Sequence, residues 1–215
     1  MILTPEIDVK DYKVYQPPYV LGRVDRPFND YVRNLCLELK ESKDREDSRH
    51  KLAGNLEHEY FLSKDLENAI RPVVQAAFLD RFNANQVEFG FPTIDEVKWL
   101  TTWANYQRKY EFNPTHTHTG KYSFVWWVQV PFNLQDELDL PWVKESNTPC
   151  ASLFQWEYHV LNATQSQQAT IPIDKGDEGT FFIFPANTPH QVYPFYTSDD
   201  WRISISGNFN FEFNT

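Results

Sequence analysis

The chain has few of the features that mark secreted, membrane-spanning or nucleic-acid-binding proteins. Its 215 residues include only two cysteines, Cys36 and Cys150, which are too few for a disulfide framework and predict two buried free thiols. No apolar run approaches the roughly 20 residues that span a bilayer. The N-terminus lacks the basic and apolar segments of a signal peptide, so we expect a protein of the reducing cytoplasm.

Positive charge is also scarce. Lys and Arg number 20 against 30 Asp and Glu, which gives a formal net charge of −10. Broad binding to a phosphate backbone needs a basic surface, so we expect no nucleic-acid partner. The 41% hydrophobic and 16% aromatic content is enough for one core of moderate size, and we predict a single domain over residues 1–215.

The first 95 residues or so have helical periodicity. Apolar residues recur at helical spacing over residues 28–40, which predicts an amphipathic helix. Ser63 is a good N-cap for a second helix that ends around residues 83–85, and residues 57–62 are expected to lead into it. Pro72 lies inside the apolar stripe of this helix and should kink or split it.

From about residue 96 the pattern changes to short runs rich in β-branched and aromatic residues, which are typical of strands. The expected strands cover residues 97–106, 121–130, 151–160, 169–173, 180–184, 191–195 and 202–213. Residues 134–149 are acidic and turn-rich, and predict a loop over one end of the sheet. Helices followed by such strands predict a mainly β fold, a jelly roll with two N-terminal helices packed outside.

Two histidines lie two residues apart just before the strand predicted at 121–130. His116 and His118 belong to the segment Asn-Pro-Thr-His-Thr-His-Thr-Gly. On extended backbone, side chains two residues apart point the same way, with their Cα atoms about 7 Å apart, so both can face one metal ion. Neutral imidazoles suit iron, zinc, copper and nickel. A His-x-His pair alone is equally consistent with two exposed histidines.

A third histidine and an arginine follow at strand junctions. A short loop after the apolar run 180–184 delivers His190 to the start of the next strand, where it reaches a pocket rim or caps a strand at the surface. Arg202 begins a strand in which apolar residues alternate with small polar ones such as Ser204. An exposed face usually carries Lys and Glu, so this one is better suited to a polar lumen. Arg202 could clamp a carboxylate there, with a further hydrogen bond from Ser204.

In this order the motifs resemble those of the Fe(II)- and 2-oxoglutarate-dependent oxygenases. They are N-P-x-H-x-H before an aromatic strand ending in V-Q-V-P, then G-T-x-F-x-F-P-x-x-x-x-H, then R-x-S-I-S-x-N. The resemblance covers residues 97–213 and is to the poorly characterised branch related to prolyl hydroxylases, found in bacteria and tailed phages. It implies a double-stranded β-helix over about residues 96–215, supported by a helical part over residues 1–95. It also implies Fe(II) as cofactor, with 2-oxoglutarate and O2 as cosubstrates.

The resemblance implies iron ligands as well. It makes His116 the first ligand and His190 the distal one. His118 stands where most of the superfamily has Asp or Glu, so it is either the third ligand of a three-histidine site or has another role. Glu157 and Asp139 are alternative carboxylate ligands without motif support. No catalytic residue is predicted beyond the metal site.

The 2-oxoglutarate site is implied in the same way. Arg202 pairs with the far carboxylate of 2-oxoglutarate, and Ser204 matches the serine of the R-x-S pair. Asn105 and Tyr122 lie on neighbouring strands, where related oxygenases place polar groups near 2-oxoglutarate. Ordinary strand packing is the alternative for both.

These observations predict a 2-oxoglutarate-dependent dioxygenase that hydroxylates an unknown small-molecule or protein substrate and releases succinate and CO2. Two alternatives stay open. One is a cupin-like three-histidine metal dioxygenase that needs no 2-oxoglutarate. The other is a non-catalytic jelly-roll module for binding or assembly, in which His118 marks a decayed site. We expect no membrane partner, and a homodimer stays open.

Overall fold

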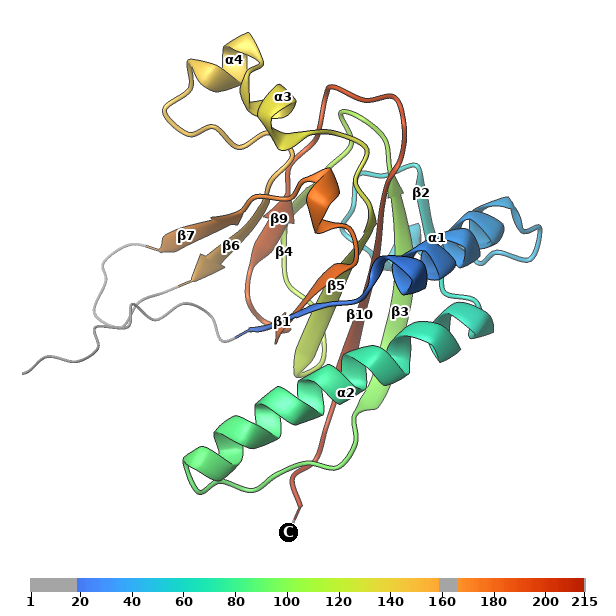
Figure 1. The fold of residues 1–215 in the computed structure, drawn as a ribbon, viewed down its shortest axis with the longest axis vertical. Coiled ribbons are helices and arrows are strands. Elements are labelled where there is room, and N and C mark those ends of the chain that lie inside the picture. The colour runs from blue at the N-terminus through green and yellow to red at the C-terminus, as the bar shows by residue number, and fades with distance from the viewer. Residues whose placement is uncertain (1–18, 159–165, 215) are drawn as a thin grey trace, which may run out of the picture.

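The computed structural model describes residues 19–158 and 166–214, and these form two antiparallel sheets with the two long helices on one side (Figure 1). The larger sheet has six strands in the order β1-β8-β5-β10-β3-β2. They are β1 (Val20–Arg23), β8 (Thr180–Pro185), β5 (Tyr122–Gln129), β10 (Arg202–Asn210), β3 (Lys98–Gln107) and β2 (His58–Phe61). The smaller sheet has the order β4-β9-β6-β7. Its strands are β4 (Asn113–His116), β9 (His190–Val192), β6 (Phe154–Tyr158) and β7 (Gln167–Ile171). Two such sheets confirm the mainly β jelly-roll fold, although they do not close into a barrel.

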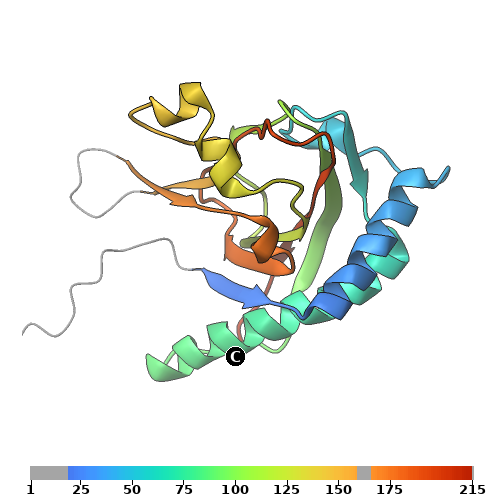
Figure 2. The same cartoon turned by 45° about the horizontal axis from the view of Figure 1, so that its top comes forward.

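Two long helices cover the outer face of the six-stranded sheet, away from the smaller sheet (Figure 2). Helix α1 spans Arg26–Glu41 and helix α2 spans Lys64–Glu88, so both predicted helices are confirmed. Ser63 caps α2 as expected, because its side chain accepts a hydrogen bond from a backbone N–H in the first turn. No helix in residues 19–158 or 166–214 is long and apolar enough to cross a bilayer.

Pro72 does not split α2, which runs as one helix of 25 residues. Its ring lies on the exposed face of the helix. The carbonyl that loses its hydrogen bond to this residue can therefore be solvated, which reduces the penalty for proline inside a helix.

Two buried clusters result from this layering. The larger lies between the helices and the six-stranded sheet, and the smaller lies between the two sheets. Trp126 and Trp127 are successive residues of β5, so their rings point to opposite faces. Trp126 joins the larger cluster and Trp127 the smaller one. Burial of large apolar side chains, worth about 1.5–3 kcal/mol each, stabilises both layers.

The structure differs from the sequence-based prediction at several further points. Strands β1 and β4 were not predicted, and α2 extends to Glu88, past its predicted end at residues 83–85. Residues 159–160 of the strand predicted at 151–160 lie outside the described part of the chain. Residues 58–61 form β2, whereas the sequence predicted a lead-in to the helix; pairing with β3 stabilises this short strand. The segment predicted as a loop at 134–149 contains α3 (Leu134–Leu138) and α4 (Pro141–Lys144). Strand β10 ends at residue 210, three residues before the predicted end.

A buried carboxylate fastens α3 to the loop between β9 and β10. Glu137 is fully buried and accepts hydrogen bonds from the backbone N–H groups of Tyr196 (2.9 Å) and Thr197 (2.7 Å). The Thr197 hydroxyl donates a third hydrogen bond to it, at 2.5 Å. This loop leads directly into Arg202, so Glu137 helps to position the start of β10.

We expect Glu137→Gln to lower the free energy of unfolding by about 2 kcal/mol, because a neutral amide accepts these hydrogen bonds less strongly and turns an NH2 group toward N–H donors. Urea denaturation followed by tryptophan fluorescence measures the change. Glu145→Gln alters an exposed acid of the same segment and is the matched control. Equal stability of the two variants would contradict this role for Glu137.

Candidate metal centre

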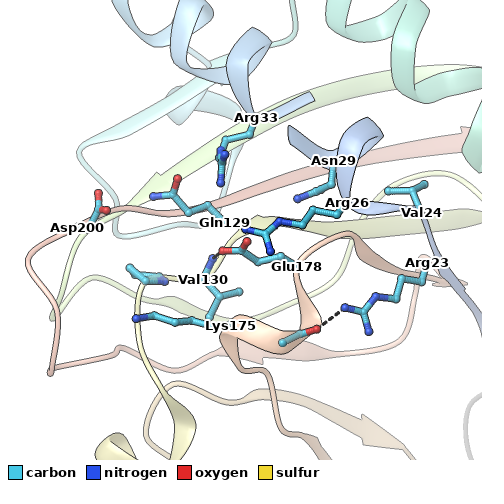
Figure 3. Close-up of a pocket in the computed structure, with 12 residues that line it drawn as sticks. Arg23, Val24, Arg26, Asn29, Arg33, Gln129, Val130, Lys175, Glu178 and Asp200 are labelled. Carbon is cyan, nitrogen blue, oxygen red and sulfur yellow. Dashed lines mark hydrogen bonds between the residues drawn. The ribbon is translucent and has the colours of Figure 1, made fainter. Parts of the chain in front are cut away.

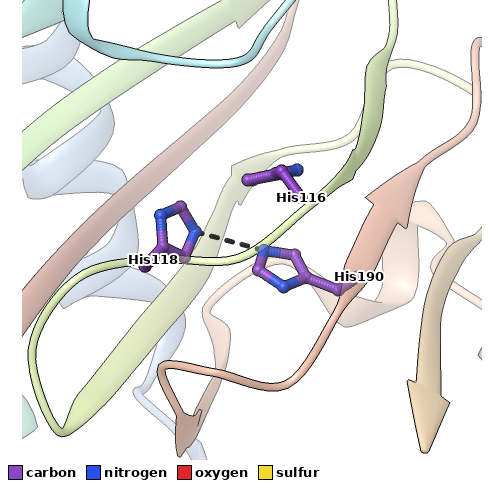
Figure 4. A group of neighbouring side chains, drawn as sticks. All are labelled: His116, His118 and His190. Carbon is purple, nitrogen blue, oxygen red and sulfur yellow. Dashed lines mark hydrogen bonds between the residues drawn. The ribbon is translucent and has the colours of Figure 1, made fainter.

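Three histidines from two neighbouring segments converge on one point (Figure 4). His116 ends β4 and His190 begins β9, and the two are directly paired across this antiparallel ladder. His118 lies two residues beyond β4, where its backbone N–H donates to the carbonyl of Ala186 at 2.8 Å. Each imidazole offers one nitrogen, and these three atoms lie within 4.8 Å of one another.

The spacing of the nitrogens fits the coordination of a single metal ion. The Nε2 atoms of His118 and His190 lie 3.2 Å apart. With metal–nitrogen bonds of about 2.1 Å, two ligands at a right angle would have their nitrogens about 3 Å apart. The pair therefore has the separation of two adjacent ligands of one ion.

The tautomers of two rings also favour a metal. His116 Nδ1 lies 2.7 Å from the carbonyl oxygen of Pro114, and His190 Nδ1 lies 2.9 Å from that of Thr188. A carbonyl only accepts, so each Nδ1 carries the hydrogen and donates it. In the neutral ring, Nε2 then has a free lone pair directed at the cluster. In metal sites, a hydrogen bond of this kind from the other ring nitrogen fixes the tautomer and orientation of a histidine ligand.

Burial keeps these imidazoles neutral. Burial, together with the smaller effect of the nearby His116, lowers the pKa of His118 to about 3. Burial also lowers the pKa of His116 and, more strongly, that of His190, which is 4% exposed. The neutral form is the one that binds metal, so the site has the required protonation state at neutral pH.

Arg202 lies in the same cavity as the histidines and is 3% exposed. Its Nε and Nη2 both donate to Oε1 of Gln107, at 3.1 and 2.7 Å, while Nη1 and Nη2 donate to the carbonyls of Ser152 and Tyr193, both at 2.8 Å. All of these acceptors are neutral. Burial lowers the pKa of the guanidinium to about 9. A buried cation with neutral acceptors is a favourable partner for an anion.

The cavity is narrow, with a volume of about 40 Å3, and it collects most of the residues predicted for the site. Asn105 and Ser204 line it and contact each other, since the Asn105 Nδ2 donates to Ser204 Oγ at 3.2 Å. The Oδ1 of Asn105 is buried without a hydrogen-bond partner, which leaves an acceptor for a bound molecule. The sequence did not predict that Gln107 lines the site. The one sequence feature that could have indicated it is its position two residues after Asn105 on the same strand.

Tyr122 lies elsewhere, so the structure does not support its predicted contact with 2-oxoglutarate. Its ring packs in the larger core, 4.7 Å from that of Phe78 of α2, and stacks on Phe209. On β5 it points to the helices, while the next residue, Ser123, points the other way. The sequence could not indicate this, because apolar residues occupy both faces of the strand.

The alternative carboxylate ligands do not join the histidines either. Among the described residues, the group with metal-ligand spacing contains His116, His118 and His190 alone. Asp139 pairs with Lys144 at 3.5 Å near α4, and Glu157 lies on β6 outside the cavity.

A larger cavity, of about 580 Å3, lies beside α1 and contains none of these histidines (Figure 3). Basic side chains line it, namely Arg23, Arg26, Arg33 and Lys175. Glu178 and Asp200 share its wall, and Arg33 pairs with Asp30 at 2.9 Å. Its positive charge is thus partly compensated, and its described lining includes no histidine or cysteine that could hold a redox metal. We therefore assign the chemistry to the smaller cavity.

Comparison with known proteins gives one family match. A family model described as "Putative 2OG-Fe(II) oxygenase" matches residues 101–209, just over half of the chain. No curated protein is similar enough in sequence to match.

Several solved structures share the fold. A prolyl-4-hydroxylase of Pseudomonas putida superposes with a TM-score of 0.56 at 10% identity, covering 90% of this chain and 92% of that one. A prolyl hydroxylase of Trichoplax adhaerens, in complex with a peptide of a hypoxia-inducible factor, gives 0.53 at 13% identity over 91% and 83%. SnoK, a non-heme alpha-ketoglutarate-dependent carbocyclase of nogalamycin biosynthesis, gives 0.55 at 11% identity over 90% and 79%. At such identities the likeness concerns the fold.

We predict a pH dependence of stability from His118. Its pKa is about 3 in the folded chain against ~6.5 in an unfolded one. Between these values the unfolded chain binds more protons, so stability rises with pH across this window. Metal-free protein should lose stability as the pH falls from 7 to 5, and His118→Gln should remove about 2 kcal/mol of that loss.

Denaturation in EDTA at the two pH values measures this effect. The exposed His50 provides the control, as His50→Gln should leave the pH dependence unchanged. An identical pH dependence in wild type and His118→Gln would show that this ring is not buried as described.

Proposed function

We propose, from the premise that this chain belongs to the 2OG-Fe(II) oxygenase family, that His116, His118 and His190 hold its iron. Membership makes the chain a 2-oxoglutarate-dependent oxygenase, which uses Fe(II), 2-oxoglutarate and O2. The finer function that we propose is hydroxylation of a C–H bond of a small-molecule or protein substrate, with release of succinate and CO2. One observation carries the proposal, the convergence of three neutral imidazoles in a cavity that also contains a buried arginine.

The histidines act as a rigid donor set. Two of them direct Nε2 into the cluster because their Nδ1–H groups donate to backbone carbonyls two residues earlier in the chain. His118 completes the set with a ring nitrogen 3.2 Å from that of His190. Iron held there would activate O2 in a reaction coupled to decarboxylation of 2-oxoglutarate. The protein contributes orientation, a dry environment and positions left open by a three-ligand set.

Arg202 is the proposed anchor for the far carboxylate of 2-oxoglutarate. Its Nε and Nη2 both bind one oxygen of Gln107, so the side chain already presents the two parallel donors that a carboxylate accepts. A carboxylate would replace this neutral amide oxygen and supply the negative charge that the buried guanidinium lacks. Ser204 and Asn105 line the same cavity, and the Ser204 hydroxyl and the Asn105 NH2 group are the donors that could contact the cosubstrate.

The three-histidine donor set also fits a second candidate, a cupin-like dioxygenase that does not use 2-oxoglutarate. In that enzyme the buried Arg202 would have no anionic partner. Formation of succinate separates the two candidates. A non-catalytic jelly-roll module would not bind the metal tightly at all.

We expect anaerobic addition of Fe(II) and 2-oxoglutarate to produce a weak visible charge-transfer band. Arg202→Gln should keep Fe(II) binding but raise the Kd for 2-oxoglutarate about 100-fold, equivalent to ~3 kcal/mol for a lost charge-assisted bidentate pair. His190→Gln should abolish the band altogether. Arg26→Gln changes an arginine whose side chain is 91% exposed and should behave as wild type. Unchanged affinity in Arg202→Gln would refute the anchor.

Gln107 allows a test of the same anchor by competition. Gln107→Glu places a permanent carboxylate on the guanidinium, so it should weaken 2-oxoglutarate binding about 100-fold. Gln107→Ala leaves Arg202 free and should change the affinity by less than about tenfold. Calorimetric titration of the Mn(II)-loaded variants measures both. Similar affinities in the two variants would place 2-oxoglutarate away from Arg202.

A further inference from the structure

A second cavity, of about 110 Å3, adjoins the metal centre on the side of the N-terminal segment. The two cavities share four lining residues, which are Trp103, Asn113, His116 and His118. The histidines therefore stand at the boundary between them. The rest of the second cavity is lined by Lys51, Leu52, Ala53, Glu59 and Thr117. Apart from Lys51 at its exposed edge, the charged group in its wall is Glu59.

Glu59 is a buried carboxylate without a partner. The residue is 0% exposed, and neither Oε1 nor Oε2 has a hydrogen-bond partner within residues 19–158 and 166–214. Buried polar groups in native proteins are nearly always hydrogen-bonded, so each unsatisfied one needs an explanation. Glu137 shows what a structural carboxylate looks like in this chain, with three donors around it. Glu59, by contrast, has no hydrogen-bond donor at either oxygen among the described residues.

The neighbouring cations do not neutralise Glu59. The charge of Arg49 partly offsets the effect of burial on the pKa of Glu59, but Arg49 donates its hydrogen bonds to both carboxylate oxygens of Asp47. Lys51 places its Nζ 5.0 Å from the centroid of the Phe61 ring and is within ion-pair distance of no described carboxylate. The nearby acids, Asp47 and Glu111, only add negative charge. Burial raises the pKa of Glu59 to about 7.

We propose that this second cavity binds a protonated amine of the substrate, with Glu59 as its counter-ion and Trp103 as an aromatic wall. An ammonium carries three N–H donors and a full positive charge, so it satisfies both carboxylate oxygens and compensates the buried negative charge. A neutral alcohol supplies one donor and leaves the charge unpaired. The indole of Trp103 is the aromatic ring that attracts cations most strongly. That the amine belongs to the oxygenase substrate rests on the proposed function.

The position of Glu59 supports a role in substrate selection. It lies on β2, outside the 101–209 segment that the family model matches. In the β2–β3 ladder it is paired with Asn105, which lines the metal cavity. A strand from the N-terminal part of the chain thus brings a carboxylate beside the metal centre. Gly54 makes room for it, because a Cβ there would lie 2.5 Å from Oε1 of Glu59.

An unpaired buried carboxylate destabilises the folded state, so replacing Glu59 by a neutral residue should not lower the stability. The folded pKa of about 7 exceeds the ordinary value of 4.5, so the native state binds the proton more tightly. Stability must then fall as the pH rises through this interval. Glu59→Gln cannot ionise, so at pH 8 it should unfold at the same or a higher urea concentration than wild type. The variant is therefore suitable for binding studies.

Saturation-transfer NMR at pH 8 tests the proposal with n-butylammonium as the probe and 1-butanol as its neutral counterpart. Wild type should bind n-butylammonium, and the signal should fall at least fivefold in Glu59→Gln and with 1-butanol. Glu57→Gln removes an exposed acid two residues away and should retain the full signal. With Mn(II) added, protons of the bound amine should broaden, which places the amine beside the histidines.

Equal n-butylammonium signals from wild type and Glu59→Gln, or equal signals for the amine and the alcohol, would overturn the amine pocket. Mn(II) binding without amine binding would also overturn it and would leave the proposed metal centre intact. Amine binding that depends on Glu59 but comes without Mn(II) binding would support the pocket while refuting the metal centre. The two proposals therefore fail separately.

Discussion

The antiparallel pairing of β4 with β9 places His116 opposite His190, and the chemistry of the molecule depends on this register. A slip of one residue would turn one of the two rings to the other face of the sheet. The Nδ1–H of each ring donates to the carbonyl two residues earlier in the same segment, and this hydrogen bond orients the ring. His118 is then placed by one backbone hydrogen bond to Ala186, in the loop that delivers His190. Three ligands thus follow from a single strand pair and the loop beside it.

The parts of this site that follow from local pattern could be predicted from sequence. The two-residue spacing of His116 and His118 belongs to one short segment, and the polar alternation that begins at Arg202 belongs to one strand. Both patterns indicate a shared inward face. Gln107 and Glu59 could not be predicted, because their roles come from pairing between distant strands. The side of the sheet on which Tyr122 lies could not be predicted for a related reason, since β5 is buried on both faces and has no polar alternation to tell them apart. In the fold as a whole, the two helices and the long strands were evident from periodicity, whereas the four-residue β2 forms only because β3 pairs with it.

Charge links the two cavities. Three neutral imidazoles add no charge to a bound divalent ion. The net charge of the centre is therefore one unit more positive than it would be with a carboxylate ligand. No Asp or Glu is among the residues that line the metal cavity, whereas Glu59 lines the adjoining one. The candidate ligands among the described residues include no carboxylate, but the adjoining cavity contains the unpaired carboxylate of Glu59. There it is too far to join the histidine cluster but is free to bind a cationic group held beside it.

The residues proposed to hold the metal and 2-oxoglutarate and the residue proposed to select the substrate come from different parts of the chain. The candidate ligands and the arginine all lie within residues 101–209, the part shared with the oxygenase family. Glu59 and the loop that carries Gly54 come from the N-terminal part, which packs on the shared fold through β2 and its ladder with β3. Proteins with this fold are described as prolyl hydroxylases and as a carbocyclase, so the fold does not determine the substrate. A carboxylate supplied from outside the shared core can therefore change which molecule is oxidised without any change in the residues that hold the metal. By the same argument, the residues around Glu59 are a better guide to the substrate of this enzyme than the substrates of its structural relatives.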